Sequence, residues 1–199
     1  MEPHATVHTY TEVRALKKRA LFSMTAAVVL AVAVPGMAAG DKMKVKPGVY
    51  DPDATGIVLA AWQDGVGLSD AGGSNHGLVL QKNGPTTTNA AAGAEITGVE
   101  GLPADQFSFD VHGACGAGSP RFNLQASDGF HFLGCADGTV TPRAEAGWSH
   151  VEFDAAQAFP PIAPGATIES VELIADEQGQ SVVDNISVDN NVVGKPGSN

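Results

Sequence analysis

The stretch CGAGSPRFNLQASDGFHFLGC, residues 115–135, decides the fold. It begins and ends at the only two cysteines of the chain and contains two short segments with strand character, 121–125 and 130–133. Between them, Ala126-Ser127-Asp128-Gly129 has the residues of a tight turn, because glycine adopts a positive φ without steric cost and aspartate tolerates the preceding position. The stretch therefore predicts a β-hairpin with its turn centred on Ser127-Asp128.

The two faces of this hairpin differ in chemistry. Because side chains alternate across a strand, Phe122 and Leu124 should share one face, and we expect Phe130 and Phe132 to join them in the core. If 107–111 is the neighbouring strand, the opposite face collects the polar side chains of Arg121, Asn123, Gln125, His131, Ser108 and Asp110. Planar polar groups on a sheet can bind sugar hydroxyls through paired donors and acceptors. The alternative is an ordinary solvated face, on which Arg121 simply pairs with Asp110.

Cys115 and Cys135 are expected to form a disulfide bond. Two cysteines in an exported chain most simply pair with each other, and two buried free thiols are the alternative. A turn centred on Ser127-Asp128 places Cys135 opposite Pro120 rather than opposite Cys115. The glycine-containing segment 116–119 must therefore fold back or bulge to bring the two sulfurs together.

The inference of export comes from the start of the chain. A basic region at 14–19 precedes an uncharged apolar run at 21–34, and 35–39 offers small residues for cleavage. This layout predicts a secretory signal peptide over residues 1–39 and a secreted protein. An uncleaved anchor is the alternative, but the apolar run is shorter than the roughly 20 residues that a spanning helix needs.

The chain is acidic, and cleavage would make it more so. It has 11 Lys or Arg and 22 Asp or Glu, a net charge of −11. Removing the four basic and two acidic residues of the leader leaves seven and 20, a net charge of −13. A protein of this sign is poorly suited to neutralising phosphates, which argues against nucleic acid and anionic membrane surfaces as partners.

Short strands separated by turns rich in Gly, Pro, Asn and Asp run along the rest of the chain, and no segment keeps a helical period for long. The pattern predicts an all-β fold, an antiparallel β-sandwich of eight to nine strands over 55–192. We expect a linker over 40–54 before it and a disordered tail over 193–199 after it. The expected strands are 55–62, 77–81, 94–99, 107–111, 121–125, 130–133, 148–153, 167–175 and 181–188.

Three of these strands carry a resemblance to a known group of proteins. The strand 147–153 resembles the W-x-x-V-x-F strand of secreted carbohydrate-binding-module-like jelly rolls of the galactose-binding-like group. Residues 167–174 resemble their penultimate strand and 183–186 their closing DNI or DDI strand. The likeness covers residues 55–190 and extends to uncharacterised secreted bacterial proteins. It implies a jelly-roll fold and a glycan or cell-surface ligand, although the fold alone does not decide function.

Asp184 is the candidate metal ligand. Alternation places Val182, Asp184, Ile186 and Val188 on one face, and a carboxylate among apolar neighbours must be paired, hydrogen-bonded or metal-bound. In the jelly rolls that the chain resembles, the matching aspartate can ligate a structural Ca²⁺. Ca²⁺ takes six to eight oxygen ligands, and no dense set of them adjoins Asp184 in the sequence. Acceptance of backbone N–H bonds is therefore the favoured alternative, and we expect no other cofactor.

The two tryptophans differ in their expected roles. Trp62 ends a strand beside the Gly/Asp-rich loop 63–75 and is the candidate stacking platform for a sugar ring. Trp148 begins a strand of core-like residues and is expected to pack internally.

Few residue patterns in the sequence indicate catalysis. Glu152 and Asp154 lie two apart, as paired glycosidase carboxylates could, but the third acid of that pattern is missing. The histidines lack metal-ligand spacing, and no serine lies in a nucleophile-elbow sequence. We therefore expect a secreted, non-catalytic domain that binds a glycan or a cell-surface ligand. The alternative is a structural or adhesion protein of an extracellular layer that binds no sugar.

Overall fold

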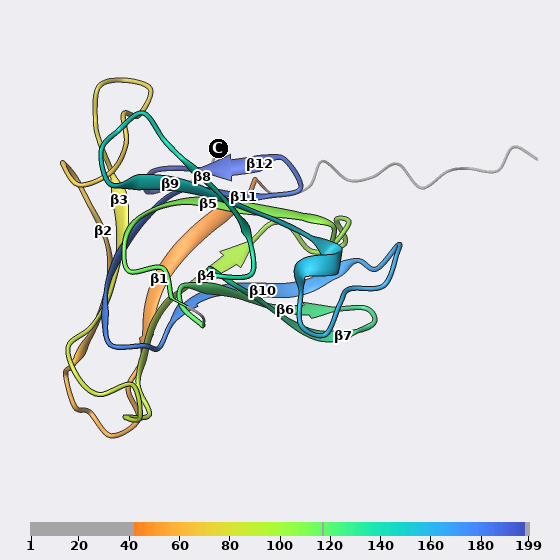
Figure 1. Cartoon of the computed structure of the whole chain (residues 1–199), viewed down its shortest axis with the longest axis horizontal. Helices are drawn as coiled ribbons and strands as arrows, with labels where there is room; N and C mark the ends of the chain where they lie inside the picture. The colour runs from red at the N-terminus through yellow and green to blue at the C-terminus, as the bar shows by residue number, and fades with distance from the viewer. Residues whose placement is uncertain (1–41, 117, 198–199) are drawn as a thin grey trace, which may run out of the picture. The chain divides into compact units, whose positions relative to one another are not determined.

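The computed structural model describes residues 42–116 and 118–197, so the predicted signal peptide lies outside the described residues. The described part is built from strands in two antiparallel sheets that pack face to face (Figure 1). The expected all-β antiparallel sandwich is therefore confirmed. Within these residues, no helix has the length and apolar character needed to cross a membrane.

Sheet A has five strands in the order β1-β4-β10-β6-β7. They are β1 (Lys44–Tyr50), β4 (Ala91–Thr97), β10 (Ile168–Ala175), β6 (Arg121–Ala126) and β7 (Gly129–Gly134).

Sheet B has seven strands in the order β2-β3-β11-β5-β9-β8, with β12 paired to β11. They are β2 (Val58–Gln63), β3 (Gly77–Lys82), β11 (Gly179–Val188), β5 (Gln106–Gly113), β9 (Trp148–Asp154), β8 (Thr139–Pro142) and β12 (Asn191–Val193). Strands β3 to β7 and β9 to β11 are distributed between the sheets as in an eight-stranded jelly roll.

Three strands lie outside the predicted set: β1, β8 and β12. The expected linker 40–54 is wrong, because β1 pairs with β4 along its whole length and Val45 is buried in the core. The sequence of β1 looks like a linker since it is an edge strand whose outward positions carry Lys44 and Lys46. The expected tail also begins too early, because Val193 is buried in β12.

The core between the sheets is centred on four phenylalanines. Phe122 projects from sheet A, and its ring centroid lies 5.5 Å from those of Phe107 and Phe109 and 6.0 Å from that of Phe153, all in sheet B. All four side chains are almost completely buried. Fully burying one such aromatic ring contributes roughly 2–3 kcal/mol, so this cluster holds the hairpin strand β6 against the opposite sheet.

The hairpin forms with the predicted turn, but three side chains of its second strand, those of Phe130, His131 and Phe132, point to the opposite face from the one predicted. Ala126 pairs with Gly129, which places Leu124 opposite His131 and Asn123 opposite Phe132. Because residues that pair across antiparallel strands share a face, His131 joins Leu124 in the interior. The prediction that Phe130 and Phe132 lie in the core is therefore wrong. They are 44% and 38% exposed on the outer face of sheet A.

The disulfide and its offset register are present. Cys115 and Cys135 are bonded, with their Cα atoms 5.4 Å apart. The N–H of Cys135 donates to the carbonyl of Pro120 at 3.0 Å, so these two residues are opposite each other as expected. The approach segment folds back through a hydrogen bond from the N–H of Gly116 to the carbonyl of Ser119 at 2.8 Å.

Candidate ligand-binding face

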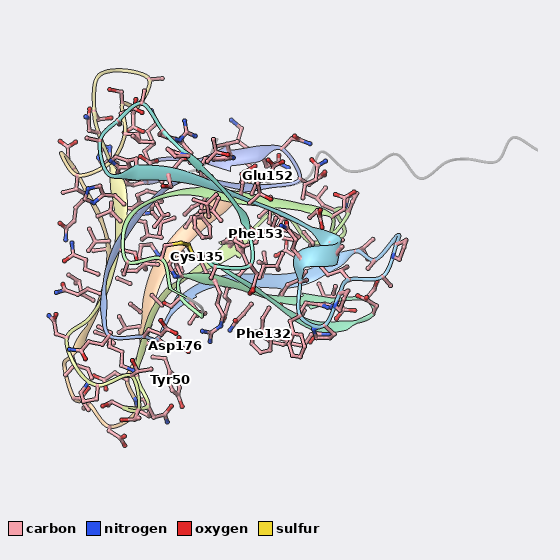
Figure 2. All side chains as sticks on the ribbon, viewed as in Figure 1. Tyr50, Phe132, Cys135, Glu152, Phe153 and Asp176 are labelled. Carbon is pink, nitrogen blue, oxygen red and sulfur yellow. A yellow bond between two sulfur atoms is a disulfide. The ribbon has the colours of Figure 1, made fainter. Side chains whose placement is uncertain are left out.

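A pocket of about 720 Å³ lies on the outer face of sheet A. Its floor comes from β1, β4, β10 and β6, and one wall comes from the loop 86–90 between β3 and β4. Tyr50 and Asp176 lie on the side of sheet A that faces away from sheet B, and Phe132 lies on the same side (Figure 2). The site is therefore assembled from segments that are far apart in the sequence.

Small residues in the middle of the floor make the sheet face hollow. Gly48 of β1 pairs with Gly93 of β4, and Gly93 pairs with Ile174 of β10. A Cβ atom added at Gly93 would lie 2.7 Å from the carbonyl oxygen of Leu173 and 2.9 Å from Cδ1 of Ile174. Glycine is therefore required there by close packing, and two adjacent strands contribute no side chain to this part of the surface.

A row of polar side chains crosses the floor beside these glycines. In register across four strands it runs through Lys46, Glu95, Glu172 and Asn123. Glu95 and Glu172 are directly opposite each other, an arrangement of like charges that costs stability. Both are exposed in the pocket, and neither has an ion-pair partner within 4 Å among the described residues. Their carboxylates are therefore available to solvent and to a ligand.

Arg121 supports this floor from one end. Its guanidinium donates two hydrogen bonds to the carboxylate of Asp176, both at 2.7 Å, and its Nε donates to Oδ1 of Asn123 at 2.8 Å. The Arg121 guanidinium holds the pKa of Asp176 below its ordinary value, against the opposing effect of burial. Since a bidentate pair fixes both partners, Arg121 orients Asn123 and Asp176 toward the pocket.

Aromatic side chains continue the face beyond the pocket, at the β7 edge. Phe132 pairs with Asn123, and its ring centroid lies 4.9 Å from that of Phe130 and 5.7 Å from the guanidinium carbon of Arg121. Phe159 is 75% exposed and exchanges two backbone hydrogen bonds with Phe132. We call these three residues, Phe130, Phe132 and Phe159, the aromatic edge. Exposed rings beside planar polar groups form a surface that can stack on a flat, partly apolar ligand.

Three of the residues expected to bind a ligand lie on this face. Arg121 and Asn123 line the pocket, and Gln125 lies farther along β6 on the same side, opposite Phe130. His131 does not lie there. It is buried, with its ring nitrogens 2.7 Å from the carbonyl oxygen of Pro160 and 3.0 Å from the carboxylate of Asp128.

Asp110 is also absent from this face. It lies in β5 of sheet B and is fully buried. Its carboxylate is hydrogen-bonded to Arg143, to Nδ2 of Asn185 at 2.7 Å and to Nδ1 of His150 at 2.8 Å. The expected neighbour of β6 is wrong because β10, which follows later in the chain, occupies that position in sheet A. Arg121 therefore pairs with Asp176 and not with Asp110.

Trp62 has a structural position. Its ring packs against the core, and its Nε1 donates to the carbonyl of Val45 at 3.2 Å. This contact joins β2 of sheet B to β1 of sheet A, so Trp62 is not the exposed platform expected from the sequence. Trp148 is buried as expected, in a small cluster with Leu68, Val79 and Val182 outside the main core.

Asp184 is buried, 1% exposed, and lies on the same side of β11 as Val182, but it does not share that side with Ile186 and Val188 as simple alternation predicts. A β-bulge between Asp184 and Ser187, with Asn185 at a φ of 45°, turns Ile186 into the core and leaves Asp184 on the other side of β11. Its two oxygens accept the N–H groups of Leu68 at 2.7 Å and of Asn185 at 2.6 Å. Burial, together with the nearby carboxylates of Asp70 and Asp110, nonetheless raises the pKa of Asp184 to about 6.

The donor set around Asp184 does not match a Ca²⁺ site. Ca²⁺ binds six to eight oxygens, whereas both oxygens of Asp184 already accept backbone N–H bonds. Within residues 42–116 and 118–197, no three acidic, histidine or cysteine side chains gather in an arrangement that could hold a metal ion. The structure favours hydrogen bonding as the role of Asp184, which is also the alternative that the sequence favours, and melting experiments with Ca²⁺ and with chelator can test it.

Sequence reasoning missed the residues of the site that come from β1, β4, β10 and the aromatic edge. Glu95 and Glu172 each alternate with apolar neighbours, which indicates an outward position. No signal in the sequence places β4 beside β10, however. The outward position of Phe130 and Phe132 follows from the two-residue turn once Ala126 is paired with Gly129.

Comparison with known proteins gives one remote likeness. No protein-family model matches the chain, and no curated protein matches it. The enzymatically active domain of tailspike protein 4 from bacteriophage CBA120 is similar over 77% of this chain, with 12% identity and a TM-score of 0.33. The chain spans 19% of that protein's length. That solved structure is of an enzymatically active domain, and the prediction that this chain has no enzymatic activity is withdrawn. A likeness this remote assigns no activity to the chain.

Proposed function

We propose that the protein is a secreted domain that binds a glycan on the outer face of sheet A. The observation that carries the proposal is the continuity of the face. A pocket with Glu95, Glu172 and Asn123 on its floor leads directly to the exposed ring of Phe132 in the same cross-strand row. Sugars combine many hydroxyl groups with an apolar ring face, and such a ligand uses both halves of this surface. The disulfide bond is consistent with an extracellular location.

Carboxylates and a carboxamide suit the hydroxyl groups of a neutral sugar better than they suit an anionic one. Glu95 and Glu172 are acceptors, and they outnumber the exposed cation Lys46 in the pocket, since Arg121 and Asp176 are paired with each other. Like-charge repulsion would therefore disfavour a sulfated or uronic-acid chain. We expect neutral oligosaccharides to bind and acidic ones to be excluded.

The test is a titration of the purified protein with neutral and acidic oligosaccharides, in which binding is measured by calorimetry or NMR. Glu172→Gln and Phe132→Ala should each weaken binding about tenfold, the effect of losing roughly 1.4 kcal/mol from a charge-assisted hydrogen bond or a stacking contact. Glu152→Gln is the matched control, because Glu152 is an exposed glutamate on β9 of the opposite sheet (Figure 2). If no glycan is retained, or if all three variants bind like wild type, the face is not a glycan site. The protein then fits the structural or adhesion role better.

The same experiment also measures cleavage. Glu95 and Glu172 are opposed carboxylates in a pocket, and glycoside hydrolysis uses carboxylates in pairs. New reducing ends that appear with wild type and not with Glu172→Gln would indicate hydrolysis of the bound glycan. Binding without new reducing ends would indicate recognition alone.

A further inference from the structure

Lys82 is a buried cation next to the pocket. It is the last residue of β3, and it is 1% exposed although lysine is among the residues least often buried. Its Nζ donates to three backbone carbonyl oxygens, those of Thr86 at 3.1 Å, Thr88 at 2.6 Å and Asp176 at 2.8 Å. All three protons of the ammonium group therefore have an acceptor.

These contacts join the two sheets at the pocket. Lys82 extends from sheet B, Thr86 and Thr88 belong to the pocket wall, and Asp176 follows β10 of sheet A. The side-chain hydroxyl of Thr86 also accepts the N–H of Gln178 at 3.0 Å, and the carboxylate of Asp176 is held by Arg121. One ammonium group thus fixes the wall to the end of the strand that contributes Glu172 and Ile174 to the floor.

We propose that Lys82 is a positioning residue for the pocket, which holds the loop 86–90 in the arrangement that a ligand needs. The reason is the direction in which the three backbone carbonyl groups point. Three carbonyl oxygens converge on one point, and only a donor with three protons at that point satisfies them. Without it, the carbonyls turn toward solvent, and the wall leaves its place beside Glu95 and Tyr50. This inference rests on the proposed function for the identity of the ligand, but the ordering of the wall can be measured without any ligand.

The first experiment compares Lys82→Met with Lys44→Met by hydrogen exchange. Methionine keeps the length of the lysine chain and removes the ammonium group, while Lys44 is an exposed lysine of β1 that does not line the pocket and has no hydrogen bond among the described residues. Lys82→Met should speed exchange about tenfold or more at the amides of Thr88, Ala90 and Gln178. The amides of β6 and β9 should keep wild-type protection. Wild-type exchange of the wall in Lys82→Met would overturn the inference.

The second experiment measures ligand affinity with neutral oligosaccharides at a temperature where both variants are folded by near-ultraviolet circular dichroism. Lys82→Met should bind about tenfold more weakly, because a disordered wall must be ordered on binding, and Lys44→Met should bind nearly as wild type does. If wild type binds no glycan but the wall loosens in Lys82→Met, the proposed function fails and the positioning role stands. If glycan binds equally to wild type and Lys82→Met, the positioning role fails.

A measurement on the wild-type protein covers the case in which Lys82→Met does not fold. A buried ammonium group with three acceptors exchanges its protons slowly, so the ¹⁵Nζ resonance of Lys82 should be visible at neutral pH, whereas those of Lys44 and Lys46 should be exchange-broadened. Absence of a distinct Lys82 resonance under conditions that retain the backbone spectrum would contradict the arrangement on which the inference depends.

Discussion

The ionisation of the buried carboxylate of Asp184 should make the unfolding free energy of the protein depend on pH. Its pKa is raised to about 6 from an ordinary value of 3.8. At 1.36 kcal/mol per pH unit, the difference of about two units corresponds to about 3 kcal/mol of destabilisation when the group is ionised in the folded protein. The native state binds this proton more tightly than the unfolded state does. The unfolding free energy should therefore fall as pH rises from about 4 to about 6, with the full penalty present above pH 6.

The assay is urea unfolding at about pH 5 and about pH 7.5 in the presence of a chelator. From these pKa values, protonation of Asp184 should make wild type about 1 kcal/mol more stable at the lower pH. Asp70, Asp128 and Asp176 have lowered pKa values, so they remain ionised at both pH values and do not contribute in this window. The quantity to compare is the difference between wild type and Asp184→Asn, because the contributions of groups common to both proteins cancel in it.

Asp184→Asn should be less stable than wild type at both pH values. The asparagine amide has only one acceptor oxygen, so its NH₂ group is placed against the N–H of Leu68 or of Asn185, donor against donor, and one hydrogen bond is lost. The deficit should be about 1 kcal/mol larger at pH 5, since only wild type gains a proton. Asp51→Asn is the matched control. Asp51 also accepts two backbone N–H bonds, from Thr55 and Gly56, but its pKa is lowered, mainly by the bond from Thr55. A deficit for Asp184→Asn that does not change with pH would refute the reasoning.

Three further predictions concern stability. Replacing both Cys115 and Cys135 by serine should cost about 3 kcal/mol on the chain-entropy model for a separation of 20 residues, and lower the melting midpoint by roughly 6–12 °C. Mass spectrometry with and without reductant checks the bond itself, and a midpoint equal to wild type would show that the bridge adds no constraint. Wild type should melt at the same temperature in Ca²⁺ and in chelator, since Asp184 already accepts two N–H bonds, whereas a midpoint raised by Ca²⁺ and unchanged in Asp184→Asn would establish a metal site. Arg121→Lys should cost about 1 kcal/mol in urea unfolding, because lysine cannot form the bidentate pair with the partly exposed Asp176, and wild-type stability would mean that the pair contributes nothing.

The hairpin shows how much of the structure can be predicted from the local sequence pattern. The turn at Ser127-Asp128 predicts the position of Pro120 opposite Cys135, and the structure has that pairing. The same turn also fixes which residues share a face, but Phe130 and Phe132 are hydrophobic enough to suggest a core position. Here the backbone register prevails over composition, because a shift of one residue would also expose Leu133 and break the pairing of β6 with β7.

Two other differences arise from features that alternation does not describe. The bulge at Asn185 places Ile186 and Val188 on the opposite side of β11 from Asp184, since it inserts an extra residue into the period of two. β1 looks like a linker because an edge strand needs only one buried face and can carry lysines and proline on the rest.

The sequence by itself determined the all-β class, the positions of nine strands and the outward polar side of Arg121, Asn123 and Gln125. These depend on local alternation and turn chemistry, which act over a few residues. Only the tertiary structure decided that β10 lies between β4 and β6, and therefore that Glu95, Glu172 and Asn123 form one row. It also decided the pocket and the burial of Lys82, because both depend on residues that approach each other from distant parts of the chain.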